Sequence, residues 1–228
     1  MAINIAIFVP EGMVIASDCL SFMRTVRDDG FSHTHTKRTF GLFNKYAISF
    51  CDNGYAQGLP YGYYVAKFQQ DNWNLANQRP AEVASAFVKY LTDFHNLKDI
   101  DKFYIAGYDK LNNQSIPYVA FYESNELHVV NIDKDNNSVY NFHAIGETYW
   151  LYKILLNTKI IEDKSEVEFG NIDIDFTKYS IADAVEFAKS LILISAKLDY
   201  LAQFSNRIGE NVTLATITLM DGVEIKEL

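Results

Sequence analysis

Segments with strand-like sequence occur in separate blocks along this chain, and this order constrains the fold more than any other feature. The first block covers 3–51, in which the apolar runs are broken at Pro10-Glu11-Gly12 and at Asn44. The second block covers 102–144 and the third covers 212–225. Grouped strands favour layered α+β folds, whereas parallel sheets require a helix between successive strands. We therefore predict an α+β fold in which two sheets pack face to face with helices outside each.

Helical patterns lie between these blocks. Residues 81–97 carry apolar side chains such as Val83 and Phe87 at spacings of three and four, which is the periodicity of an amphipathic helix. Pro80 suits the first turn of that helix. Residues 54–74 show a similar but weaker pattern. These segments predict two successive helices between the first two strand blocks.

A second helical region precedes the last strands. We expect a short helix over 147–156, followed by an acidic, irregular surface connection over 158–179. Ser180 and Asp183 are spaced as in a capping box, with Asp in place of the usual Glu. We predict that the long helix beginning there ends near Phe204.

Composition supports one folded domain over residues 1–228. Hydrophobic residues make up 49% of the chain and charged residues 21%, so burial of apolar surface can offset the entropy of folding. A chain of 228 residues suits one large domain better than two. The formal net charge is −9, which argues against a nucleic-acid partner, because such proteins need a basic surface.

Several features favour a cytoplasmic location. The two cysteines, Cys19 and Cys51, cannot form a disulfide framework and suit a reducing compartment. The first residues have no basic region of the kind that begins a signal peptide. Apolar runs such as 191–194 are far shorter than the roughly 20 residues that span a bilayer. We therefore expect no membrane partner.

Five segments in order resemble the proteasome β-subunit family of N-terminal-nucleophile (Ntn) hydrolases. They are Gly12-Met13-Val14-Ile15-Ala16-Ser17-Asp18, the pair 37–40 and 45–50, the pair 103–109 and 117–119, residues 144–146, and the pair 215–218 and 221–224. No single motif is specific, but the ordered set spans nearly the whole chain. Residues 198–209 are similar, more weakly, to the bacterial proteasome-like branch called Anbu. The resemblance implies a four-layer α-β-β-α sandwich of two antiparallel sheets and a homo-oligomer packed laterally through its outer helices.

The resemblance also implies a particular chemistry. In this family the first residue of the mature chain is Thr, Ser or Cys, and its side chain attacks a carbonyl while its own α-amine serves as the base. That amine has a pKa near about 7.7–8.0, so it can be neutral at working pH. An aspartate at the end of the second strand and a lysine on the next hairpin set the electrostatics around the nucleophile.

Two of these chemical positions are altered in this chain. Asp18 matches the family aspartate, and counting back through the hairpin places Ala2 at the nucleophile position. Arg38 falls at the lysine position, and arginine cannot release a proton as lysine can. Asp199 matches the supporting aspartate near the end of the long helix, and Ser205 is the candidate for the serine near it.

Other departures concern the surroundings of the nucleophile position. The segment that follows Asp18 is longer than the family pattern, and Glu147 and Thr148 replace the family's Gly/Ser-rich turn after Gly146. Where Met1 is retained, we expect it to block amine chemistry at residue 2. The scaffold pattern is thus kept while the chemical positions change.

The first hypothesis is a proteasome-like protein without threonine peptidase chemistry. It would act as a homo-oligomeric scaffold or as a pseudoenzyme with a peptide or protein ligand. The alternative is an active Ntn peptidase or amidohydrolase whose nucleophile at position 2 has been replaced by alanine. A third hypothesis is an unrelated binding module that uses the same sandwich. None of the three requires a cofactor or metal.

Other candidate sites have plainer interpretations. His33 and His35 would face the same side of a strand and could bind a metal with a third ligand, but we expect solvated histidines. Cys19 and Cys51 could be reactive if their pKa values were lowered, but we expect small buried side chains. The acidic residues of 162–175 could bind a cation, but a solvated surface loop is more typical.

Overall fold

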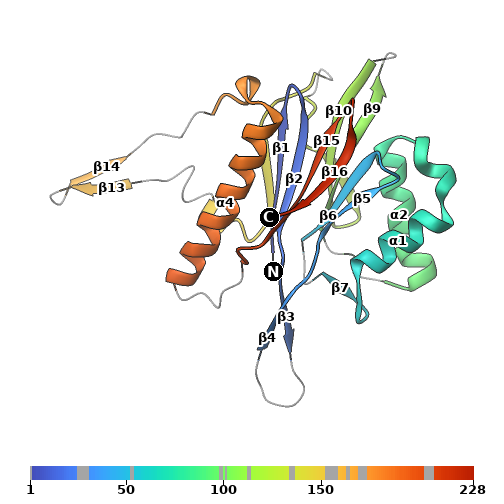
Figure 1. The fold of residues 1–228 in the computed structure, drawn as a ribbon, viewed down its shortest axis with the longest axis horizontal. Helices are drawn as coiled ribbons and strands as arrows, with labels where there is room; N and C mark the ends of the chain where they lie inside the picture. Colours follow the sequence, from blue (N-terminus) through green and yellow to red (C-terminus); the bar gives the residue numbers. More distant parts are fainter. Residues whose placement is uncertain are drawn as a thin grey trace.

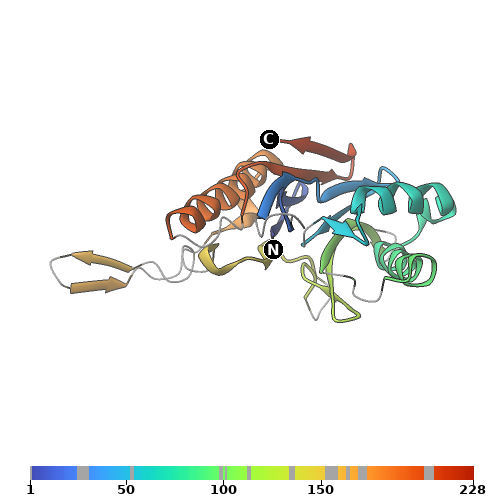
Figure 2. The same ribbon diagram turned by 90° about the horizontal axis from the view of Figure 1, so that it is seen from below.

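Two five-stranded antiparallel sheets form the centre of the molecule, with helices on the outer face of each (Figure 1, Figure 2). This computed structural model describes residues 2–24, 31–51, 54–97, 100, 102–111, 114–133, 137–151, 159–162, 165–168, 174–202 and 208–228. The first sheet, in spatial order, contains β12 (Phe142–Gly146), β1 (Ile3–Val9), β2 (Gly12–Asp18), β15 (Val212–Thr218) and β16 (Gly222–Glu227). The predicted four-layer α-β-β-α sandwich is confirmed.

The second sheet is built from the middle of the sequence. In spatial order it contains β11 (Glu126–Val129), β10 (Gln114–Glu123), β9 (Phe103–Leu111), β6 (Tyr46–Phe50) and β5 (Thr39–Leu42). The helices α1 (Tyr61–Asp71) and α2 (Pro80–His95) pack on its outer face, joined by the 3-10 helix η1 (Trp73–Asn77). The first sheet is covered by α4 (Ile181–Leu201), which follows the 3-10 turn η2 (Phe176–Lys178).

Strand β1 shows how the sequence specifies these layers. Every residue of its sequence INIAIFV is buried. Ile5 and Ile7 face the helix layer, whereas Ala6 and Phe8 face the other sheet. A strand covered on both faces needs apolar side chains at successive positions rather than at alternate ones. This accounts for the uninterrupted apolar run over 5–9.

Helix α4 begins as its sequence predicts. Ser180 Oγ accepts a hydrogen bond from Asp183 N (3.2 Å), and Asp183 Oδ2 accepts one from Ser180 N (2.9 Å). The Glu11 carboxylate accepts a further bond from Ile181 N (2.8 Å). These contacts satisfy main-chain donors that the first turn of a helix leaves unpaired.

Other expected elements differ from those observed. Part of the irregular connection expected over 158–179 is a two-stranded ribbon, β13 (Lys159–Glu162) and β14 (Ser165–Glu168). The polar segment after Asp18 forms another ribbon, β3 (Leu20–Arg24) and β4 (Phe31–His35). Figure 1 shows both ribbons projecting from the sandwich. Neither has an apolar alternation strong enough to predict a strand.

The first helix also starts later than expected. Residues Tyr55–Ala56 (β7) and Leu59–Pro60 (β8) pair as a short hairpin before α1 begins. Its two turn residues, Gln57 and Gly58, both have positive φ (48° and 79°), as tight hairpin turns require. The helix expected over 147–156 begins later, because 147 and 148 are not helical and 149–151 are. Residues 152–156 lie outside the described part of the chain. No described helix is both long and apolar enough to cross a membrane.

Candidate functional site

The start of the chain lies directly beside the end of the second strand. Residues Val9 and Gly12 pair at the turn of the β1–β2 hairpin, and the same register pairs Asn4 with Ser17. It therefore brings Ile3 to Asp18, where Ile3 N donates a hydrogen bond to Asp18 Oδ1 (2.9 Å). The hairpin itself places residue 2 next to this carboxylate.

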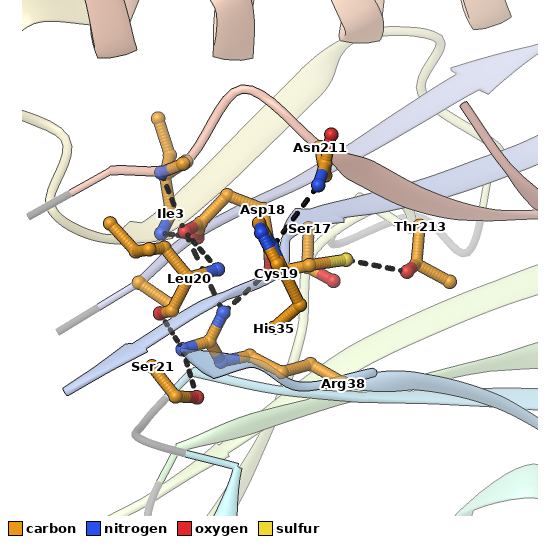
Figure 3. A network of polar contacts seen from close by, with 12 residues as sticks. Ile3, Ser17, Asp18, Cys19, Leu20, Ser21, His35, Arg38, Asn211 and Thr213 are labelled. Carbon is orange, nitrogen blue, oxygen red and sulfur yellow. Dashed lines mark hydrogen bonds and ion pairs between the residues drawn. The ribbon is translucent and has the colours of Figure 1, made fainter. Parts of the chain in front are cut away.

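The Asp18 carboxylate is fully buried and receives three main-chain hydrogen bonds (Figure 3). Besides Ile3, the donors are Leu20 N (3.1 Å) and Gly209 N (3.0 Å), both to Oδ2. A side chain at Gly209 would come within 2.7 Å of Leu20 Cβ, so only glycine allows this approach. Burial raises the pKa of the Asp18 carboxyl, and the charge of Arg38 together with the three amide donors opposes that shift.

Arg38 is also fully buried, and its guanidinium is held mainly by main-chain oxygens. Nη1 donates to Asp18 O (2.6 Å), whereas Nη2 donates to Leu20 O and to Ser21 Oγ (3.2 Å). The ion pair with Asp18 Oδ2 is longer, at 3.6 Å. The cation thus fixes the start of the β3 ribbon as well as neutralising the carboxylate.

Ala2 is fully buried and has no side-chain oxygen or sulfur. Its carbonyl oxygen accepts hydrogen bonds from Glu147 N (2.9 Å) and Cys51 Sγ (3.4 Å). Gly146 passes close to the same carbonyl with φ at +92°, and a Cβ there would lie 2.0 Å from Ala2 O. The main chain around residue 2 is therefore held on several sides.

A chain of four buried polar side chains, which was not predicted from the sequence, runs between the sheets next to this cluster. Ser49 Oγ donates to Asn4 Oδ1 (3.1 Å), and the hydroxyls of Ser49 and Thr39 are 2.8 Å apart. Thr39 and Ser17 are also 2.8 Å apart through their hydroxyls. The signal available in the sequence was small polar residues at inward positions of apolar strands. This chain links β1 and β2 to β5 and β6.

The remaining predicted site residues are placed less completely. Asp199 is fully buried near the end of α4. Ser205 and Met1 lie outside the described residues. The structure thus brings Ala2, Asp18 and Arg38 together, and the pairing of Asp199 with Ser205 stays a prediction.

The other candidates lie beside the cluster. Neither Cys19 nor Cys51 is in a disulfide, and both are buried. The Cys19 Sγ lies 2.8 Å from Thr213 Oγ1, and burial raises the pKa of its thiol. The ring of His35 is exposed, with Nδ1 3.0 Å from the Asn211 amide. Over the described ranges, no three His, Cys, Asp or Glu side chains are grouped to hold a metal.

The His33 side chain and residues 163–164 and 169–173 of the acidic segment lie outside the described part of the chain. A metal site at His33 and His35 and a cation site in the acidic segment 162–175 therefore remain untested hypotheses.

Comparisons with known proteins show a relationship at the level of the fold. No family model matches the chain, and no curated protein matches it. Among solved structures, it is similar to a Gly-1 mutant of Anbu from Hyphomicrobium sp. strain MC1, with a TM-score of 0.59 and 13% identity. The similarity covers 100% of this chain and 86% of the other. The whole chain therefore has the same proteasome-like fold.

Proposed function

From this proteasome-like fold, we propose a protein that lacks the threonine peptidase chemistry of the Ntn hydrolases. It acts as a single domain over residues 1–228, either as a homo-oligomeric scaffold or as a peptide-binding pseudoenzyme. The main support for this proposal is that residue 2, which is fully buried beside Asp18, is an alanine. At the position where Ntn chemistry needs a side-chain oxygen or sulfur, this chain has a methyl group.

The contacts of Arg38 support the same proposal. A lysine at this position would be a compact charge that changes its pKa readily, whereas arginine stays protonated. The Arg38 donors are directed to two carbonyl oxygens and a hydroxyl. We infer that Arg38 is a structural cation that holds the turn after β2.

A labelling experiment tests the loss of chemistry. The protein is incubated with an electrophilic probe that carries a peptide warhead, and separately with a broad peptide library. We expect no adduct by intact mass and no cleavage products. An adduct that peptide mapping places on residue 2, or on any residue around Asp18, would overturn the proposal.

Restoring the missing atoms provides the matched control. The variants Ala2→Thr and Ala2→Thr/Arg38→Lys are produced behind a cleavable leader, so that removal of the leader exposes the α-amine of residue 2. The parent chain is treated in the same way. If a variant is labelled and the parent is not, the loss of the Ntn chemistry is due to the positions changed in that variant. Equal labelling of parent and variants would reveal a nucleophile other than the side chain of residue 2 and would overturn the proposal.

The assembly part of the proposal has its own test. We expect light scattering at micromolar concentration to show a homo-oligomer, whereas a monomer would contradict the scaffold role.

Neither cysteine is in a disulfide, which fits the reducing cytoplasm of a bacterium, where we expect this chain to act.

A further inference from the structure

Helix α4 covers only part of the outer face of the first sheet. It packs on β1, β2 and part of β15, and β16 lies beyond it as the outer strand (Figure 1). A hollow of about 560 Å³ lies between the first turns of α4 and the β15–β16 hairpin. Its lining residues are Ile181, Ala182, Val185, Glu186, Thr216, Thr218, Asp221, Gly222, Val223, Glu224 and Lys226. We call this hollow the β16 groove.

The main chain of β16 has a free hydrogen-bonding edge along this groove. Val212 and Leu228 exchange two hydrogen bonds (3.1 and 2.8 Å) and so form a hydrogen-bonded pair. In an antiparallel ladder, hydrogen-bonded and non-hydrogen-bonded pairs alternate, so the register of β15 and β16 assigns every later pair. By this alternation, the N–H and C=O groups of Val223 and Ile225 point away from β15. Among the described residues no strand pairs with that edge.

The charges around the groove are mainly negative. Glu186 lies on the helix side, and Asp221 and Glu224 lie on the strand side. Among the described lining residues the lysine is Lys226, whose Nζ lies 2.9 Å from Oε2 of Glu224. A ligand that complements this surface therefore carries positive charge.

The two faces of β16 carry different side chains, charged on one face and apolar on the other. A strand that pairs with β16 should therefore alternate in the same way. Glu224 and Lys226 lie on the α4 side, opposite Thr216 and Leu214 in the register. Val223 and Ile225 lie on the other side, where they pack near Gly41 of β5. Because side chains of a strand alternate between faces, an added strand would place every second residue beside the carboxylates.

We propose that the β16 edge and groove bind an extended segment of another protein in which basic residues alternate with apolar ones. The segment adds to the sheet as a further strand, so its main chain bonds to Val223 and Ile225. Its basic side chains reach Glu186 and compete with Lys226 for Glu224. In an antiparallel pair of two copies centred on Ile225, Glu224 of each copy would face Lys226 of the other, so a dimer is the competing outcome that the experiments below distinguish. This site is independent of the chemistry at Ala2.

Fluorescence anisotropy with a labelled peptide of alternating lysine and valine tests this proposal. The matched control peptide has glutamate in place of lysine. We expect the lysine peptide alone to bind, and its affinity to fall about tenfold between low and high salt because rim charges are screened. Failure of the lysine peptide to bind at low salt, or equal binding of both peptides, would overturn the proposal.

Two kinds of variant locate the site. Glu186→Lys/Glu224→Lys should lower affinity about tenfold or more, whereas Glu126→Lys on β11 changes the same charge elsewhere and should leave it unchanged. Val223→Pro removes a donor at the free edge, where proline is tolerated, and should weaken binding by a similar factor. Circular dichroism checks the fold of each variant. Equal effects of all charge reversals, or a dimer that Glu224→Lys abolishes, would contradict this assignment.

Discussion

The two ends of strand β15 carry charged groups in opposite environments. At one end Val212 pairs with Asp18, and the Asp18–Arg38 pair there is fully buried with its donors directed to main-chain oxygens. At the other end the carboxylates of the β16 groove are open to solvent. The comparison shows that the buried pair fixes the shape of the chain, whereas the exposed charges remain available to a ligand.

The Arg79–Asp109 pair is intermediate between these two ends. Arg79 Nη2 lies 2.7 Å from Asp109 Oδ2, and Nε donates to both carboxylate oxygens. The arginine side chain is 60% exposed and the aspartate 5%. Burial thus decreases from Asp18–Arg38 through this pair to the groove, and the cost of removing a charge should decrease in the same order.

Removal of the buried cation should have the largest effect. Arg38→Ala leaves the buried Asp18 carboxylate without its cation and the carbonyl groups of Asp18 and Leu20 without their guanidinium donor. We expect a loss of about 3–5 kcal/mol in the free energy of unfolding. Urea denaturation measures it. Arg38→Lys keeps the charge but not the planar fork, and should fall between Arg38→Ala and the parent. A loss below about 1 kcal/mol for Arg38→Ala would place this pair with the exposed ones.

The intermediate pair should show a smaller effect that depends on pH. Hydrogen bonds from Arg79 lower the pKa of Asp109 from its ordinary value of 3.8. The Asp109 carboxylate therefore stabilises the folded state above pH 3.8, and this contribution to the free energy of unfolding is lost as the pH falls towards the lowered pKa. We expect Asp109→Asn to cost about 2 kcal/mol at neutral pH and less in acid. Urea unfolding at several pH values checks this, and a constant difference would contradict it.

Asp18 should respond to pH with the opposite sign. Because burial raises its pKa above 3.8, protonation favours the folded state, and its contribution to stability falls as pH rises from 3.8 through the raised pKa. In Asp18→Asn this decrease should be absent. Unfolding curves of the parent and Asp18→Asn over that range test the sign, and an identical pH dependence would contradict it.

The exposed ion pair of the groove should contribute least. Lys226→Ala separates the ammonium from Glu224, and we expect a change of no more than about 0.5 kcal/mol in the free energy of unfolding. Added salt should reduce even this difference, because exposed charges are screened. Thermal melts at low and high salt measure it. A larger change would show that this pair supports the β15–β16 hairpin.

Much of the fold was predictable because it depends on local sequence. The buried pattern of β1, the turn at Pro10-Glu11-Gly12 and the capping box at Ser180 all act over a few residues. The hairpin register also follows from a short turn, and it places residue 2 beside Asp18. The grouping of strands and the turn chemistry were therefore enough to predict two packed sheets with outer helices, whereas the place of residue 2 next to Asp18 was implied by the resemblance to the proteasome β-subunit family.

Contacts between distant segments were decided only by the tertiary structure. Gly209 N reaches Asp18 across 191 positions in the sequence, and the polar chain from Asn4 to Ser49 spans both sheets. The partners of Arg38 and the free edge of β16 depend likewise on how the layers stack. Local patterns specify which residues are buried, but the hydrogen-bond partner of a buried polar group is chosen by the packing of the whole chain.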